Sequence, residues 1–411
     1  MKITFSKNKY IVLSGFTLLV LAAFFNQSLL IYAKVIVSRL VGENFLTDAL
    51  IPTLFLGLTL FSLGRIVKWV RIRDVLFILG ALAVIFISYL IYPANRPYYD
   101  DYNMGLLFTQ AIPFFVLGLC VDFQKRLLKT MSTLSYIAIV VNILYVFYYM
   151  QTREMENDAM GWAYVALFPT LISVYSLFEN KGLKQRLPAA LFSMIGGIYV
   201  VSLGTRGPIL ITLVYFAVML WYKSRRKLAL KLGLSALVIL AAVFILSGLY
   251  VNVLVGLRNM LVQNGLSSRT IDLLLGNEFI SHTSGRDVIY ATLIEKLAER
   301  PWLGYGVFGE WQFVDYTAHN IWLELCAHFG YPLGTLLLLC HMGISIQGFR
   351  KSRNPYAKNM ILLFACFAYI RGIFGGDYLY YEFTFLLGLS LHEIRAGRRM
   401  GGVRKKVRWT R

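Results

Sequence analysis

The segment Val314–Gly334, VDYTAHNIWLELCAHFGYPLG, places a histidine and an asparagine directly before a long apolar run. The pair is His319-Asn320, and the run that follows is long enough to begin a membrane-spanning helix. Apolar runs of this kind recur from one end of the chain to the other. The segment therefore predicts an imidazole held at the surface of a membrane protein.

The composition is that of a polytopic membrane protein. Hydrophobic residues make up 58% of the 411 residues and charged residues only 15%, and the mean hydropathy is +0.62. These values do not fit a soluble domain of this length. The apolar runs predict an all-α fold with about twelve transmembrane helices. The expected spans are residues 10–26, 45–64, 74–93, 103–121, 130–150, 159–178, 187–204, 207–222, 229–250, 322–345, 359–376 and 379–394.

The distribution of charge predicts that both termini are cytoplasmic. With the N-terminus inside, most of the 41 Lys and Arg residues fall in the inner segments, and most of the 21 acidic residues fall outside. The net charge of +20 then reflects topology and attraction to anionic inner-leaflet lipid, rather than nucleic-acid binding. The basic, apolar start of the chain lacks an A-x-A-like cleavage site, so we expect a retained first span.

One outer segment is long enough to build a structure of its own. The expected organisation is residues 1–250 with nine transmembrane helices, an extracytoplasmic loop at 251–321, and residues 322–411 with three more helices and a basic cytoplasmic tail. The loop contains aromatic residues and readable helical sequence, so it is not of disordered composition.

A helix is predicted inside this loop, in TSGRDVIYATLIEKLAERPWLGYG. Ser284 and Asp287 have the spacing of a capping box, with the acid three residues after the capping hydroxyl. Pro301 disfavours helical geometry in the residue before it, so the helix should end at Arg300.

Three arginines lie at the predicted outer face. Arg206 precedes Gly207-Pro208 at the start of a span, Arg286 occupies the first turn of the loop helix, and Arg371 lies near the outer end of the eleventh span. Guanidinium groups and free N–H groups at helix N-termini are suited to phosphate or diphosphate. The residues alone leave two alternatives, an interfacial anchor for Arg206 and a surface charge paired with an acid for Arg286.

His319 is a candidate general base. Helical geometry would place Leu323, Cys326 and Gly330 on its face, and Gly330 would admit another helix closely. A neutral imidazole can take a proton from a hydroxyl near neutral pH. The alternative is a histidine hydrogen-bonded within helix packing. His328 is predicted to lie on the opposite face and to tolerate replacement.

Neither a metal site nor a disulfide is predicted. The four cysteines lie in or beside apolar runs without CxxC spacing. Asp100 and Asp101 are adjacent acids in a short outer loop, a pattern that is more typical of solvated charge than of a metal site.

Four segments together resemble a known family. TRGPILI, SGRDVIY, RPWLGYGVFG and HNIWLELCAHFGYPLG resemble successive signatures of the O-antigen ligase and O-antigen polymerase superfamily of bacterial membrane glycosyltransferases. The expected spans and the single large outer loop match that family's architecture. The spacing from His319 to Gly330 fits the family's His-x10-Gly pattern.

The resemblance implies roles for particular residues. Arg206 and Arg286 correspond to the arginines thought to hold the diphosphate of the donor, and His319 to the presumed base. Asp377, in GGDYLYYEF, resembles an acid found after the penultimate span. The further expected substrate-binding residues are Asn320, Arg371 and Tyr305.

The implied reaction is glycosyl transfer from an undecaprenyl-diphosphate-linked glycan to a sugar hydroxyl at the outer face of the cytoplasmic membrane. The expected enzyme is a metal-independent polymerase, without a cofactor, of a surface polysaccharide such as O-antigen, capsule or exopolysaccharide. The alternative within the family is an O-antigen ligase that moves glycan onto lipid A-core or another acceptor. No residue decides between the two. The expected partners are the lipid-linked donor, an acceptor glycan, membrane lipid, a flippase and a chain-length regulator.

Two alternatives come from other classes. A polytopic solute transporter would usually show paired repeats and broken helices that meet at the membrane midplane, whereas this chain gathers its polar candidates at the outer face. A non-catalytic scaffold for envelope assembly would leave His319 dispensable.

Overall fold

The computed structural model describes residues 14–42, 45–152, 159–203, 205–224, 249–263, 272, 275, 286–314 and 317–408. This part of the chain is helical and contains no strand, and it includes eight helices long and apolar enough to cross a membrane. The predicted class, an all-α polytopic membrane protein, is therefore confirmed.

The elements are α1 (Gly15–Phe25), η1 (Asn26–Leu30), α2 (Ile31–Val41), α3 (Phe45–Trp69), α4 (Ile72–Ile91), η2 (Pro93–Tyr98), α5 (Asp101–Leu106), η3 (Leu107–Ala111), α6 (Ile112–Cys120), α7 (Lys125–Thr152), α8 (Ala159–Glu179), α9 (Leu183–Ser202), α10 (Arg206–Ser224), α12 (Leu249–Gln263), α14 (Arg286–Glu299), α15 (Trp311–Val314), α16 (Ile321–Lys351), α17 (Pro355–Phe374) and α18 (Tyr381–Arg408).

The predicted spans agree with these helices better in position than in number. Helices α9 and α18 occupy two expected spans without being among the eight, and α10 contributes a shorter apolar helix, Gly207–Lys223. The first span extends beyond the predicted end at residue 26, because η1 continues the helix into α2. The expected ninth span, 229–250, lies almost entirely outside the described residues.

Helix α16 is longer than one membrane crossing requires. Its 31 residues correspond to about 46 Å at about 1.5 Å per residue, against a hydrocarbon thickness of about 30 Å. Gly330 divides it with a φ of 78° and a ψ of 164°. The part after Gly330 is long enough to cross by itself, so the part before it is available to pack with the loop.

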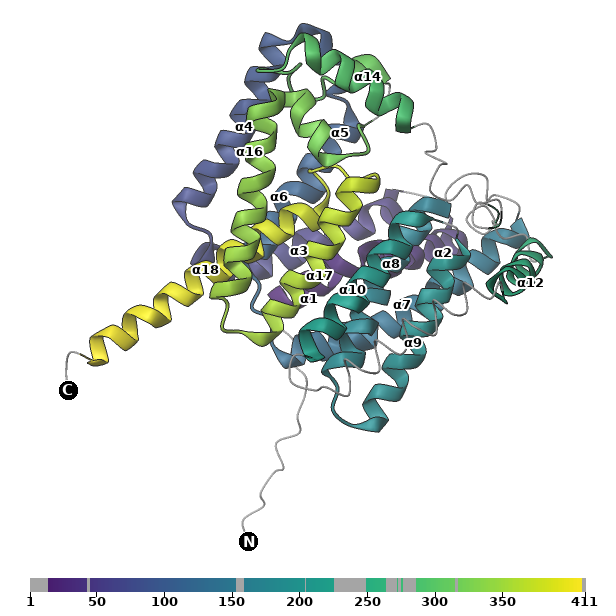
Figure 1. Cartoon of the computed structure of the whole chain (residues 1–411). Coiled ribbons are helices and arrows are strands. Elements are labelled where there is room, and N and C mark those ends of the chain that lie inside the picture. The colour runs from purple at the N-terminus through teal and green to yellow at the C-terminus, as the bar shows by residue number, and fades with distance from the viewer. Residues whose placement is uncertain are drawn as a thin grey trace.

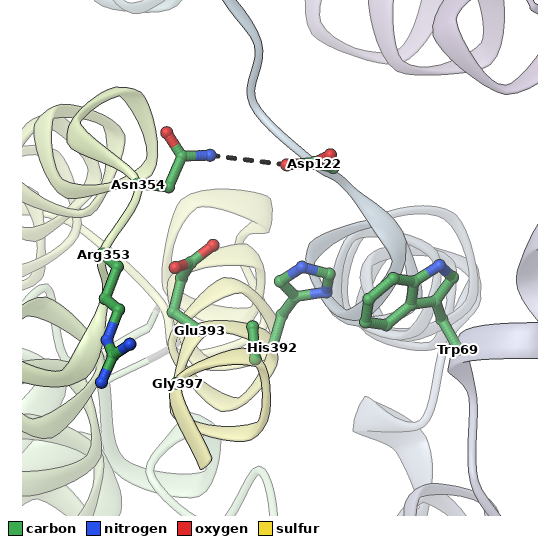
Figure 2. A pocket seen from close by; sticks show the side chains of 8 residues that line it. Trp69, Asp122, Arg353, Asn354, His392, Glu393 and Gly397 are labelled. Carbon is green, nitrogen blue, oxygen red and sulfur yellow. Dashed lines mark hydrogen bonds between the residues drawn. The ribbon is translucent and has the colours of Figure 1, made fainter. Parts of the chain in front are cut away.

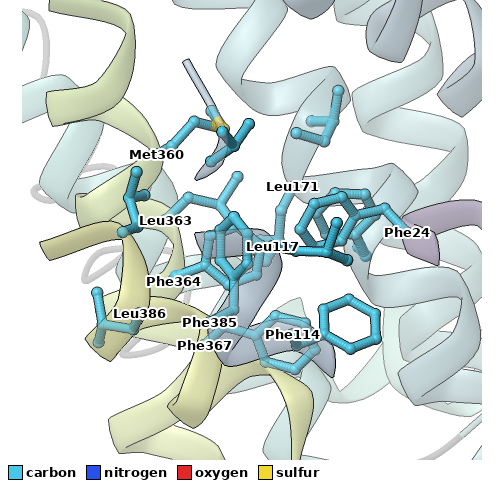
Figure 3. Packing of buried hydrophobic residues seen from close by; sticks show 14 of the residues in the cluster. Phe24, Phe114, Leu117, Leu171, Met360, Leu363, Phe364, Phe367, Phe385 and Leu386 are labelled. Carbon is cyan, nitrogen blue, oxygen red and sulfur yellow. The ribbon is translucent and has the colours of Figure 1, made fainter. Parts of the chain in front are cut away.

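The core consists of aromatic and aliphatic side chains from α1, α6, α8, α17 and α18. The Phe24 ring lies 4.9 Å from that of Phe385 at 88°, and 5.0 Å from the stacked ring of Phe168. Figure 3 shows Phe24 and Phe385 within this cluster. Because lipid is as apolar as these side chains, close packing holds the helices together rather than exclusion of water.

Helices α6 and α18 approach closely at two glycines. A Cβ on Gly118 would lie 2.6 Å from the Phe385 carbonyl oxygen, and one on Gly388 would overlap the Phe115 carbonyl oxygen. Small residues at a crossing let two backbones come together in this way. The crossing fixes the position of α18, whose first turn contributes to the site described below.

Helices α3 and α4 present apolar side chains outward. Phe61 is 85% exposed, Val67 is 75% exposed and Ile72 is 72% exposed. Contiguous exposed apolar surface on a chain of this composition is suited to lipid rather than water. The arrangement supports insertion of these helices at the periphery of the bundle.

Residues 301–310 dock on the first part of α16. The Tyr305 N–H donates to the Ala327 carbonyl (2.7 Å), the Gly306 N–H to the His328 carbonyl (3.0 Å), and the Tyr331 N–H to the Pro301 carbonyl (2.8 Å). In Figure 1, α14 lies beside the upper end of α16 at one end of the molecule, near α4 and α5.

Gly330 has a different role from the predicted one. The backbone of Trp302 occupies the place that a Cβ on Gly330 would take, and the positive φ suits glycine. Gly330 therefore admits a loop segment, not a second helix. Helix α14 ends at Glu299, one residue before the predicted end at Arg300, and the expected cap Ser284 lies outside the described residues.

Candidate active site

His319 lies just before α16 and is not part of it. The helix begins at Ile321, and His319 has a φ of 51°, which is uncommon for a residue with a side chain. The predicted helical face shared with Leu323 and Cys326 is therefore wrong. His319 is instead part of the turn before the helix, where it is half-buried and its Nδ1 lies 3.4 Å from Thr317 Oγ1.

Asn320 is the N-cap of α16. Its Oδ1 accepts hydrogen bonds from the N–H groups of Trp322 (3.0 Å) and Leu323 (3.2 Å). Asparagine is favoured at this position because its side chain satisfies N–H groups that have no partner within the helix. The predicted substrate-binding residue thus has a structural role, because it fixes where the helix begins after His319.

Arg286 and His319 meet at Gly375. The position of a Cβ on Gly375 would lie 3.7 Å from Arg286 Nη2 and 3.8 Å from His319 Nδ1. Arg286 is the first residue of α14, and Gly375 follows α17 with a φ of 133°. Three elements far apart in the sequence therefore bring a guanidinium and an imidazole together over a residue without a side chain.

Burial, and then the charge of Arg286, lower the pKa of His319 below its usual 6.5. The imidazole is accordingly neutral at neutral pH, which a general base requires. Tyr290 of α14 supports its backbone: the Tyr290 hydroxyl donates to the His319 carbonyl at 3.2 Å and lies 3.5 Å from the Ile373 carbonyl.

Arg371, at the end of α17, belongs to a second part of the site. Its Nη1 donates to Glu382 Oε1 at 2.8 Å, and the two side chains are 14% and 3% exposed. The guanidinium also lies over the rings of Tyr380 (4.0 Å) and Tyr164 (4.2 Å). A buried pair with aromatic faces on the cation holds the arginine in one orientation.

Tyr164 links Arg371 to the start of α10. A Cβ on Gly207 would overlap the Tyr164 hydroxyl, so this hydroxyl lies against the first turn of α10. The electrostatic influence of Arg286 also reaches Tyr164. The N-terminus of α10, Arg371 and Arg286 are thereby neighbours of one tyrosine.

Several polar atoms around this tyrosine are buried without a hydrogen-bond partner among the described residues. They are the Tyr164 hydroxyl, Thr205 Oγ1, Arg371 Nε and Glu382 Oε2. Buried polar groups are nearly always satisfied in proteins, so a group of unsatisfied donors is typical of a site that receives a ligand. The first three can donate hydrogen bonds to an oxygen-rich anion.

Arg206 is the first residue of α10, as its position before Gly207-Pro208 predicts. Its backbone therefore lies at a helix N-terminus, where free N–H groups favour an anion. The side chain of Arg206 lies outside the described part of the structure, so its predicted contact with the diphosphate stays a prediction.

The contacts of Asp377 and Tyr305 are with other residues. Asp377 is 4% exposed and accepts a hydrogen bond from the Leu379 N–H (2.6 Å), and burial raises its pKa to about 6. It faces Glu324 and, at longer range, Glu310, not Arg371. The Tyr305 hydroxyl donates to the Lys296 carbonyl at 2.8 Å and ties the end of α14 to the loop.

His328 does not suit the tolerant role expected of it. It is 1% exposed, with Nδ1 3.2 Å from the Tyr378 hydroxyl and Nε2 against Glu310 Oε2. Nε2 also accepts the Phe308 N–H at 3.0 Å. His328 lies in a buried polar cluster, and its removal would leave several polar groups without partners.

Sequence reasoning missed Tyr164 and Glu382. A signal for Glu382 was present, because an acid at the start of an apolar span is costly and calls for a cation, and Arg371 ends the preceding span. Tyr164 offers no such signal. It is one of 26 tyrosines, and only its contacts with Gly207 and Arg371 distinguish it.

A pocket of about 220 Å³ lies at the other end of α17 and α18. It is lined by Trp69, Asp122, Arg353, Asn354, His392, Glu393, Ala396 and Gly397. Figure 2 shows Glu393 and His392 on α18, with the Asn354 amide pointing to Asp122 at 3.4 Å. The pocket begins where α17 starts, whereas Arg371 lies at the end of that helix, so it is separate from the candidate site.

Comparison with known proteins gives one match. Residues 189–338 match a family model described as O-Antigen ligase, a region that includes Arg206, Arg286 and His319. No curated protein and no solved structure matches the chain. The match supports the superfamily recognised from the sequence segments, and with it a ligase-type or polymerase-type activity in general.

Proposed function

We propose that this chain, a multi-pass member of the O-antigen ligase and polymerase superfamily, polymerises a surface polysaccharide from undecaprenyl-diphosphate-linked repeats at the outer face of the cytoplasmic membrane. The observation that carries the proposal is the meeting of Arg286 and His319 at Gly375. A fixed cation beside a neutral base suits a reaction in which a hydroxyl loses a proton while a diphosphate leaves.

The donor diphosphate would lie between Arg286 and the first turn of α10. Arg286 contributes a permanent charge, and the α10 N-terminus contributes free N–H groups beside Arg206. The Tyr164 hydroxyl and Arg371 Nε, buried and unpaired among the described residues, supply neutral and charge-assisted donors. The pairing of Arg371 Nη1 with Glu382 holds the guanidinium in place, and its contact with the Tyr164 ring also positions Tyr164.

The acceptor hydroxyl would approach His319. The hydroxyl oxygen forms a bond to the anomeric carbon of the donor, and the imidazole takes its proton. The bond between the anomeric carbon and the diphosphate oxygen breaks, and its electron pair leaves with the diphosphate. Fixed donors that face the developing charge lower the barrier. The proposed step uses no metal ion and no cofactor.

A polymerase needs only lipid-linked glycan as both donor and acceptor, whereas a ligase needs a second acceptor such as lipid A-core. The site requires no more than a hydroxyl near His319, and we propose the polymerase on this simpler requirement. Outward orientation follows from the charge distribution, which places the basic segments inside. A flippase and a chain-length regulator are the partners that such a polymerase would use.

The test is turnover by purified full-length protein in detergent, with lipid-diphosphate-linked repeats as the substrate. Wild type should form longer glycan on a gel. His319→Ala should bind the donor as well as wild type and form no product, because the residue acts on the acceptor proton. Arg286→Ala should weaken both donor binding and product formation.

Two results would contradict the proposal. Full turnover by His319→Ala would remove the assignment of the base, and full turnover by Arg286→Ala would remove the assigned contact with the diphosphate. Product that forms only when lipid A-core is added would identify a ligase, which uses the same site for a different acceptor.

A further inference from the structure

A buried group of metal-binding side chains lies beside, but outside, the proposed transfer site. One donor atom each from Glu310, Glu324 and His328 lies within 4.8 Å of the other two. All three side chains are 1% exposed. Glu310 comes from the loop segment before α15, while Glu324 and His328 are one turn apart on the first part of α16.

This cluster contains more hydrogen-bond acceptors than donors. His328 Nε2 accepts the Phe308 N–H and also contacts Glu310 Oε2, so two acceptors face one another there. Asp377 adds a third carboxyl group, which interacts with Glu324. Among the described residues, no lysine or arginine is paired with these carboxyls in an ion pair. Buried carboxylates without a cation are very unfavourable.

One carboxylate oxygen of the cluster indicates a ligand independently of this charge. Glu324 Oε2 is buried and has no hydrogen-bond partner among the described residues. The groups that interact most with Glu324 are the carboxyl groups of Asp377 and Glu310, so three carboxyl groups share this small buried volume. A cation at this point would satisfy Glu324, Glu310 and the His328 ring together.

We propose that Glu310, Glu324 and His328 bind one divalent cation, with Asp377 as an outer neighbour. Two carboxylates and a neutral imidazole balance a charge of +2. The mixed oxygen and nitrogen donors favour a first-row metal such as Mn²⁺ or Zn²⁺ over Mg²⁺, which prefers oxygen and water. The Tyr378 hydroxyl at His328 Nδ1 would orient the ring, and on binding the Nε2 lone pair would turn from the Phe308 N–H to the cation.

The cation would join three parts of the fold. Glu310 lies in the docked loop segment, Glu324 in the first turn of α16, and Asp377 between α17 and α18. The first turn of α16 is capped by Asn320, next to His319. The site therefore holds the elements that carry the proposed base without touching the reacting groups, and the inference does not depend on the identity of the substrate.

The probe is Mn²⁺, measured by electron paramagnetic resonance on full-length protein in detergent after chelation and gel filtration. Wild type should bind one Mn²⁺ per chain and gain thermal stability on binding. Glu324→Gln and Glu310→Gln keep the shape of the side chain, and their affinity should fall about tenfold or more. Zn²⁺ should compete for the same site.

Two buried residues elsewhere serve as matched controls. Glu382→Gln removes a buried carboxylate paired with Arg371, and His341→Gln removes a buried histidine from the later part of α16. Both should bind Mn²⁺ as wild type does. The proposal is overturned if wild type binds no Mn²⁺ at one per chain, or if Glu324→Gln, eluting as folded protein, binds it equally well.

Discussion

His319 Nδ1 and Arg286 Nη2 each lie within 4 Å of the position that a Cβ on Gly375 would occupy, at 3.8 Å and 3.7 Å. The arginine begins α14, and the histidine precedes α16. Because the cation and the base share one small space, a change to either should alter the behaviour of the other. This coupling gives the first prediction.

Arg286→Gln should change the pH dependence as well as the rate. Burial and then Arg286 lower the pKa of His319, so wild-type activity should persist as the pH falls below 6.5 and decline at the lower pKa. Without the guanidinium only burial remains, and the decline should begin at a higher pH, nearer to 6.5. The measurement is kcat/KM against pH, with each profile scaled to its own plateau. An unshifted acid limb would show that the two residues do not interact.

The same substitution should lower the plateau by about 2–4 kcal/mol of transition-state stabilisation, the usual cost of removing one charge-stabilising donor. Arg286→Lys should recover little of this loss, because an ammonium group cannot offer two parallel donors to a diphosphate. Equal activity in Arg286→Lys and wild type would exclude a forked contact.

Tyr164→Phe should separate activity from stability. The hydroxyl has no partner among the described residues, so its removal should leave the melting temperature unchanged or raise it. If the hydroxyl binds the donor, kcat/KM should fall by a factor that corresponds to about 1 kcal/mol or more of transition-state stabilisation, the contribution of one hydrogen bond. Tyr215→Phe is the matched control, since its hydroxyl is also buried and unpaired in the described part of the chain but lies further along α10. An equal effect of both substitutions would remove Tyr164 from the site.

Gly330→Ala should loosen the loop from α16. The φ of 78° costs a residue with a Cβ about 1–2 kcal/mol, and the new methyl group would also overlap the Trp302 backbone. We expect a clear drop in melting temperature and in turnover. Gly343→Ala, on the same helix but facing open space, should be neutral or slightly stabilising. Equal melting temperatures for the two variants would contradict the docked arrangement.

Labelling should establish the orientation of the chain. Val288 on α14 is 67% exposed, and Leu183 at the start of α9 is 80% exposed. In intact spheroplasts a membrane-impermeant maleimide should label Val288→Cys and not Leu183→Cys, with wild type as the background for the native cysteines. The reverse pattern would place the candidate site in the cytoplasm and remove the proposed function.

Much of the architecture was predictable, because a membrane-spanning helix is specified locally. A run of apolar residues must satisfy its own backbone hydrogen bonds in lipid, and this forces a helix whatever its neighbours are. The described helices therefore fall close to the expected spans, and α14 ends beside Pro301 as predicted. The count differs because α9, α10 and α18 are less apolar or shorter than the other spans, and because the expected span 229–250 lies almost entirely outside the described residues.

The sequence by itself determined the class of the protein, the helices, the position of Arg206 and Arg286 at helix N-termini, and the segments that carry the family resemblance. The tertiary structure alone decided which groups meet: Arg286 with His319 at Gly375, Arg371 with Glu382 rather than Asp377, and Tyr164 with the start of α10. It also decided that His319 lies outside its predicted helix. The physical reason is that these contacts join residues distant in the chain, and each depends on glycine positions and helix crossings that bring backbones together, which no local pattern of residues specifies.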